Sequence, residues 1–239
     1  MEFLSGVFHL GCGIYYICGT YWDFQIVTPH VNTYGGRWKF LTFLNLIIQL
    51  LYFIIAPLGD VVTLLSGRKD NWLVKLRDLL FSTLAFPLGV FVAATFWGIY
   101  LMDRELIFPR ALDKIFPSWL NHILHTWCAI LIILEAAFIK HKYPKNRVGL
   151  GVLAVFTAIY LSWISWIAYA ADFWVYPFLR LMPNSGKVAF FTLASCLSAF
   201  LYLLGKWMTL FIWGGNGEKK STNNSTLKEG TKKRVKKAD

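Results

Sequence analysis

Long apolar runs alternate with short polar connections along the whole chain. Each run is close to 20 residues long, and the six runs cover about 3–22, 38–58, 79–102, 120–139, 148–169 and 188–213. A helix of about 20 apolar residues crosses the roughly 30 Å hydrocarbon core of a bilayer. The pattern therefore predicts an all-α, polytopic membrane protein, in which a bundle of six transmembrane helices occupies 1–213.

Composition agrees with a membrane protein. Of the 239 residues, 56% are hydrophobic and only 15% are charged, against about a quarter charged in a soluble domain. The four cysteines all lie inside predicted spans without a C-x-x-C pair, which argues against a disulfide framework or a structural zinc site. The first run lacks the basic start of a cleaved signal peptide, so we expect a retained helix.

The net charge of +11 does not indicate nucleic-acid binding. Eight Lys and Arg residues lie between 219 and 237, in a Gly-, Asn-, Ser- and Lys-rich segment for which we predict a disordered tail over 214–239. Eight more lie in the two short loops on the same face of the bundle, against seven on the other face. Because positive residues favour the cytoplasm, we expect both termini to be cytosolic.

The last four residues bear on location. Lys236, Lys237, Ala238 and Asp239 place lysines third and fourth from the end, as in the dilysine retrieval signals of endoplasmic-reticulum membrane proteins. The signal requires a cytosolic end, which the predicted topology supplies. The alternatives are a lysine-rich solubilising end and a plasma-membrane location.

Two predicted spans carry polar side chains that lipid does not tolerate. On the second, Lys39, Thr42, Asn45 and Gln49 follow a helical spacing and form one stripe. On the fourth, Asn121, His122 and His125 share a face by the same rule, with Cys128 and Glu135 further in. Polar groups at membrane depth face the bundle interior or a cavity.

The two stripes lie at the same depth. Thr42 comes four residues after Trp38, and His125 comes six after Trp119. With a rise of about 1.5 Å per residue, both lie roughly 6 to 9 Å below these interfacial tryptophans. Contact between the two side chains requires this agreement.

The most specific interpretation of this pair is a nucleophile, Thr42, next to its general base, His125. A threonine hydroxyl becomes nucleophilic when a neutral imidazole takes its proton. Donors at the helix starts would stabilise an oxyanion, and Lys39 and Arg37 would bind a substrate carboxylate at the interface. Structural alternatives remain open. The Thr42 hydroxyl could donate a hydrogen bond to a carbonyl of its own helix, and Asn45 could hold neighbouring helices together. A metal or haem site starting from His122 and His125 would require an acidic or histidine partner at that depth.

Several motifs resemble a known family. TYGGRWKFLTF at 33–43, RDLL at 77–80, LAFPLGVF at 84–91, WLNHILHT at 119–126 and WVYP at 174–177 are similar to segments of the androgen-induced family, which includes the androgen-dependent regulator of tissue factor pathway inhibitor. The similarity runs from about 33 to 205. It covers neither the N-terminal segment nor the tail.

The resemblance implies an atypical transmembrane threonine hydrolase that cleaves fatty acid esters of hydroxy fatty acids. It implies Thr42 as nucleophile and His125 as base, and it does not carry His122 over as catalytic. The implied substrate is a lipid with a free carboxylate, and the reaction needs neither cofactor nor metal. The alternative function is a non-enzymatic lipid-binding carrier, receptor or adaptor. Oligomeric state is not encoded in these patterns.

Overall fold

The computed structural model describes residues 2–28 and 31–235, with side chains for 4–28 and 31–214. Every regular element in these ranges is helical, and none is a strand. The α-helices are α1 (Glu2–Gln25), α2 (Leu41–Ser66), α3 (Trp72–Leu80), α4 (Phe86–Asp103), α5 (Ser118–His122), α6 (Cys128–Phe138), α7 (Asn146–Ala171), α8 (Pro177–Leu181) and α9 (Asn184–Val235). The shorter turns are η1 (Gly36–Lys39), η2 (Phe81–Ala85), η3 (Arg104–Leu106), η4 (Arg110–Lys114) and η5 (Ile123–Trp127).

The described residues contain five helical segments that are long and apolar enough to cross a membrane. They are Leu41–Ser66, Trp72–Leu106, Ser118–Phe138, Asn146–Ala171 and Asn184–Gly214. The predicted all-α, polytopic class is confirmed. For the first predicted span, 3–22, the structure has α1, which is 24 residues long. That this helix also crosses the membrane, to give six spans, stays a prediction.

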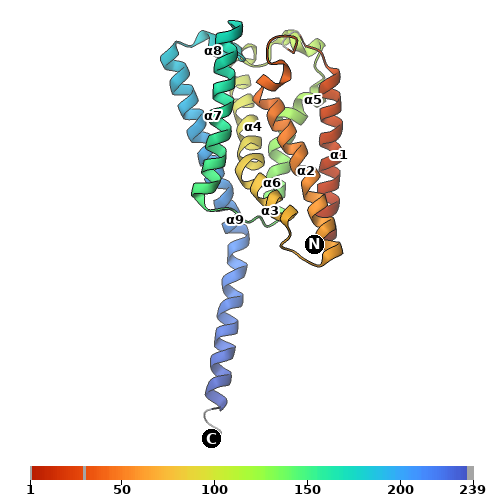
Figure 1. The fold of residues 1–239 in the computed structure, drawn as a ribbon, viewed down its shortest axis with the longest axis vertical. Helices are drawn as coiled ribbons and strands as arrows, with labels where there is room; N and C mark the ends of the chain where they lie inside the picture. The colour runs from red at the N-terminus through yellow and green to blue at the C-terminus, as the bar shows by residue number, and fades with distance from the viewer. Residues whose placement is uncertain (1, 29–30, 236–239) are drawn as a thin grey trace.

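The helices lie side by side in one bundle (Figure 1). Helices α1 and α2, in red and orange, form one edge, α7 and α9, in green and blue, form the other, and α4 and α6 lie between them. The first turn of α1 and the point where α9 leaves the bundle lie at the same end. The core is aromatic and aliphatic; Tyr52, Phe53, Phe81, Phe86 and Ile132 are almost fully buried in it.

Two spans contain a π-helical turn, in the third span close to Pro87, where the sequence predicts a kink, and in the fourth span where a regular α-helix is expected. In the third span, η2 joins α3 to α4 just before Pro87, which has no backbone N–H to continue the helical ladder. In the fourth span, η5 joins α5 to α6. A π-turn is wider than an α-turn, so it changes which side chains share a face beyond it.

Beyond the bundle, the structure differs from the prediction of a disordered tail from 214. Helix α9 continues without interruption to Val235 and projects away from the other helices (Figure 1). The segment contains no proline that would stop a helix. Lys236 to Asp239, the proposed retrieval signal, lie outside the described residues.

Candidate active site

The structure brings Thr42 and His125 together. Thr42 is the second residue of α2, and His125 lies in the π-turn η5. The hydroxyl Oγ1 of Thr42 lies 3.3 Å from Nε2 of His125. The distance is within reach for proton transfer, because catalytic hydrogen bonds are often long before a substrate is bound. The agreement in depth that the sequence predicts therefore extends to side-chain contact.

Asn121 orients the imidazole of His125. Nδ1 of His125 lies 2.8 Å from Oδ1 of Asn121 and 3.0 Å from the backbone oxygen of the same residue. Because both neighbours are oxygen acceptors, Nδ1 carries the proton and Nε2 remains an acceptor for the threonine hydroxyl. The ring of Phe96 stacks on the imidazole at 3.5 Å between centroids. Threonine, histidine and asparagine thus form a chain of three polar groups.

His122 is not part of this chain, and the prediction that it shares a face with Asn121 and His125 is wrong. Its side chain is exposed, its Nδ1 lies 2.9 Å from the hydroxyl of Thr126, and its ring stacks on Trp97. The cause is η5. The helix widens after residue 122, so residues 122 and 125, three apart, no longer share a face, whereas 121 and 125, four apart, still do.

A cavity opens beside the pair. The volume of this cavity is about 250 Å³. Its walls come from α2, α4, η5, α7 and α9, from α8 with the segment before it, and from the connections before α2 and between α4 and α5. Most of the lining residues are apolar, including Leu88, Phe91, Leu124, Phe156 and Leu161. Thr42 and His125 both line it. The hydroxyl and the imidazole thus meet at the wall of a space suited to acyl chains.

Lys39 lies outside the lining of this cavity. Its amino group donates to the hydroxyl of Thr33 at 2.6 Å, and it lies over the rings of Phe40 and Phe173. Burial lowers the pKa of Lys39 to about 8. The side chain holds the η1 turn in place in the present geometry, and its predicted contact with a substrate carboxylate stays a prediction.

Arg37 lines the cavity, but its guanidinium already has several partners. It donates to the backbone oxygens of Asp23, Phe24 and Ile26, where α1 ends, and its Nε lies 3.2 Å from the Asp23 carboxylate. Burial raises the pKa of Asp23 to about 6, and the positive charge of Arg37 opposes that shift. Arg37 ties the start of α2 to the end of α1 beside the cavity.

Asn45 and Gln49 belong to helix packing. Both are fully buried, and Nε2 of Gln49 donates to Oδ1 of Asn45 at 3.3 Å and to the backbone oxygen of Ala85 at 2.8 Å. These contacts hold α2 against the π-turn η2. Asn45 lies outside the cavity lining, so of the predicted stripe on α2 only Thr42 reaches the cavity.

A second polar cluster lies at the other end of the bundle, and Glu135 is its centre. The Glu135 carboxylate accepts from the hydroxyl of Tyr52 and lies 3.1 Å from Nε2 of His9 and from Nε2 of His141. All four side chains are buried. Asp60, in contact with His9, comes 18 residues after Thr42 on α2, which puts this cluster roughly 27 Å along the helix from the threonine.

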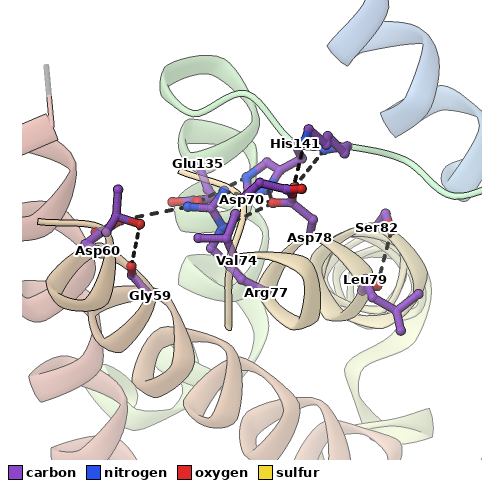
Figure 2. A network of polar contacts seen from close by, with 12 residues as sticks. Gly59, Asp60, Asp70, Val74, Arg77, Asp78, Leu79, Ser82, Glu135 and His141 are labelled. Atoms are coloured by element: carbon purple, nitrogen blue, oxygen red, sulfur yellow. Dashed lines mark hydrogen bonds and ion pairs between the residues drawn. The ribbon is translucent and has the colours of Figure 1, made fainter. Parts of the chain in front are cut away.

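Further carboxylates complete the cluster (Figure 2). Asp60 lies 2.6 Å from Nδ1 of His9. Figure 2 shows Asp78 beside His141, whose Nδ1 lies 2.9 Å from the Asp78 carboxylate. Arg77 donates to Asp78 at 2.8 Å. Each imidazole thus has a carboxylate on both of its nitrogens, and the carboxylates have cationic or hydroxyl donors. Among the residues the structure describes, no group of three or more His, Cys, Asp or Glu is placed to hold a metal ion.

Sequence patterns did not reveal this second cluster. His9 has no charged neighbour at helical spacing on α1, and His141 lies just past the end of α6. The available signal was the buried charge itself: Glu135 in the middle of an apolar span needs partners from other helices.

The all-helical bundle, with polar groups enclosed at both ends, defines a polytopic membrane protein with a threonine–histidine pair in an apolar cavity. The chain belongs to the FAR-17a/AIG1-like protein family, whose model matches residues 4–210. It is 41% identical to the human androgen-induced gene 1 protein over 196 residues, 79% of this chain and 82% of that protein. It is 39% identical to the human androgen-dependent TFPI-regulating protein over 189 residues, again 79% and 82%.

A more distant relative is a membrane protein of Schizosaccharomyces pombe, 28% identical over 181 residues, which are 73% of this chain and 76% of that protein. No solved structure matches the chain. The family resemblance predicted from the motifs is therefore confirmed.

Proposed function

We propose that this protein is an integral membrane hydrolase that cleaves fatty acid esters of hydroxy fatty acids. One observation carries the proposal: the hydroxyl of Thr42 lies 3.3 Å from Nε2 of His125 at the wall of an apolar cavity. A hydroxyl in contact with an imidazole acceptor is the minimal arrangement for acyl transfer. The family motifs carry the same two residues.

In the first half-reaction, Nε2 of His125 takes the proton from Thr42 while Oγ1 attacks the ester carbonyl carbon. The tetrahedral intermediate then collapses, and the bond between the carbonyl carbon and the alkoxide oxygen breaks. The imidazolium returns its proton to that oxygen, which leaves as the hydroxyl group of the hydroxy fatty acid. The acyl group remains bound to Thr42 as an ester.

In the second half-reaction, water replaces the alcohol. His125 takes a proton from water, the hydroxide oxygen attacks the acyl-threonine carbonyl, and the bond to Oγ1 breaks. Thr42 regains its proton from the imidazolium, and the fatty acid leaves. Asn121 holds Nδ1 throughout, so the same nitrogen, Nε2, takes and returns each proton.

The test is turnover of such an ester by purified protein, with release of fatty acid measured by mass spectrometry. Thr42→Val keeps the shape of the side chain and removes the hydroxyl, and we expect a loss of about 100-fold or more; the same holds for His125→Gln. Thr192→Val is the matched control, because that hydroxyl donates to its own helix at the exposed face of α9. Undiminished turnover by folded Thr42→Val protein would refute the proposal.

The cavity itself favours one alternative, a lipid-binding carrier, receptor or adaptor without turnover. Apolar walls would hold acyl chains whether or not a bond is broken. Binding of intact ester to wild-type protein with no product after many hours would favour this alternative.

We place the proposed hydrolase in the endoplasmic-reticulum membrane with both termini cytosolic. Lys236 and Lys237 support the location in the endoplasmic reticulum. The excess of positive residues on one face supports the orientation with cytosolic termini. Replacing both lysines by serine should move a tagged protein to later membranes of the secretory route. Retention of the serine variant in the endoplasmic reticulum would contradict the role of the signal.

A further inference from the structure

Two tyrosine hydroxyls meet at the residue that precedes Thr42. The backbone N–H of Leu41 points to the hydroxyl of Tyr160 at 3.1 Å and to that of Tyr176 at 3.0 Å. The two hydroxyls lie 3.0 Å from each other. Tyr160 comes from α7, and Tyr176 belongs to the WVYP motif just before α8. Both tyrosines line the cavity that Thr42 and His125 line.

The number of protons and acceptors distinguishes the two hydroxyls. The N–H of Leu41 has a single proton, so one acceptor is enough for it. Tyr160 is sufficient as that acceptor, and it donates its own proton to the backbone oxygen of Lys39, 3.2 Å away. Tyr176 is therefore not needed to satisfy Leu41. Its proton goes to Tyr160 when the cavity is empty and is available to a ligand oxygen when it is filled.

The burial of the two rings agrees with this difference. Tyr160 is buried at 8% exposure, whereas Tyr176 is partly exposed. The Tyr176 ring stacks on Phe178 and meets the edge of Phe40, so its position is fixed while its hydroxyl borders the cavity. Burial raises the pKa of Tyr176, so the hydroxyl keeps its proton at neutral pH and remains a donor.

We infer that Tyr176 is a catalytic residue that donates a hydrogen bond to the oxyanion formed when Thr42 attacks the ester carbonyl, and that Tyr160 positions it. The start of α2 supplies backbone N–H groups and the positive end of a helix dipole at the same place. A fixed side-chain donor beside them stabilises the charge that develops on the carbonyl oxygen. The inference rests on the proposed function, because an oxyanion forms only if an ester is attacked.

The test compares Tyr176→Phe with wild type on three measurements. We expect kcat to fall by about 100-fold with KM changed by less than about threefold, because the hydrogen bond is strongest in the transition state. A fatty acyl trifluoromethyl ketone forms a tetrahedral adduct with an active nucleophile, and its inhibition constant should rise by a similar factor. The dissociation constant of a non-hydrolysable ether analogue should stay within about threefold of wild type.

Two further variants complete the comparison. Tyr202→Phe is the matched control, since the Tyr202 hydroxyl is buried without a hydrogen-bond partner among the described residues and lies outside the cavity lining. Its kcat should equal that of wild type. Tyr160→Phe should lose less activity than Tyr176→Phe, because it removes the hydroxyl that positions Tyr176 but keeps the Tyr176 hydroxyl that donates to the oxyanion.

Either of two results would overturn the inference: an unchanged kcat in folded Tyr176→Phe protein, or equal weakening of the ketone and the ether analogue. The second result would make Tyr176 a wall of the cavity with no special role in the transition state. A failure of the proposed function is recognised separately, as wild-type turnover that is absent or survives Thr42→Val.

Discussion

Asn121 Oδ1 lies 2.8 Å from Nδ1 of His125, and this contact decides which imidazole nitrogen faces the threonine. Asn121 lies in α5 and His125 lies four residues later in η5, so the local backbone brings them together. The neutral amide oxygen of Asn121 fixes the orientation and the tautomer of the His125 ring without placing a negative charge in the site, as a carboxylate would. The contact turns a pair of residues into an ordered chain of three.

The first prediction concerns Asn121. In Asn121→Ala the imidazole loses its side-chain acceptor but keeps the backbone oxygen at 3.0 Å, so we expect kcat to fall by about tenfold and not to vanish. Asn121→Asp restores an acceptor and should recover most of the rate. Steady-state turnover of the ester measures both. If the aspartate variant were as slow as the alanine variant, packing and not orientation would explain the loss.

The second prediction separates the two histidines. His122 is exposed and bonded to Thr126 outside the cavity, so His122→Gln should keep ester turnover within about threefold of wild type. His125→Gln, the same change three residues later, should remove at least about 100-fold. Equal losses in the two variants, measured per folded molecule, would contradict this separation and mean that both histidines act in the reaction.

The third prediction concerns the buried cluster around Glu135. Glu135→Gln removes the charge that lies 3.1 Å from both His9 and His141, and a broken buried ion pair costs about 3 to 5 kcal/mol. We expect the free energy of unfolding in detergent to fall by about that amount. As a control, Lys75→Met breaks a pair with Asp70 in which both side chains are mostly exposed, and such pairs contribute about 1 kcal/mol at most. Equal effects would show that burial adds nothing to the cluster.

The fourth prediction is a pH dependence. The pKa of Lys39 is lowered from 10.5 to about 8 in the folded protein because the side chain is buried. Between these values the unfolded chain binds more protons than the folded one, so stability should rise as the pH increases through this window. Lys39→Met cannot titrate and should flatten that rise. Thermal unfolding from pH 7 to pH 10.5 measures it, and identical slopes in the two proteins would contradict the assignment.

The common depth of Thr42 and His125 was predictable from the sequence. The counting of residues from Trp38 and Trp119 placed Thr42 and His125 at one level, because the rise of a helix is constant. The five helical segments that are long and apolar enough to cross a membrane follow the apolar runs for the same reason. Hydrophobic length and helical rise are local properties, and a sequence carries them directly.

The direction in which each side chain points, toward the site or away from it, was less predictable from the sequence. The exposed position of His122 depends on η5, and a single π-turn leaves no simple residue signature. The contacts of Lys39 with Thr33 depend on how the η1 turn closes over the bundle. Tyr160 and Tyr176 reach Leu41 from segments more than 100 residues away in the chain. Such contacts depend on tertiary packing, and the 3.6-residue repeat of an α-helix carries no information about that packing.

The π-turn at η5 also sets the register between the two polar ends of the fourth span. A π-turn is equivalent to one residue inserted into an α-helix. Deletion of one residue between Ile123 and Trp127 would restore a regular α-helix and rotate everything beyond it by about 100° relative to Asn121. Glu135 would then leave His9 and His141 if His125 kept its place, or His125 would leave Thr42 if Glu135 did. One inserted residue thus lets a single helix serve both clusters at once.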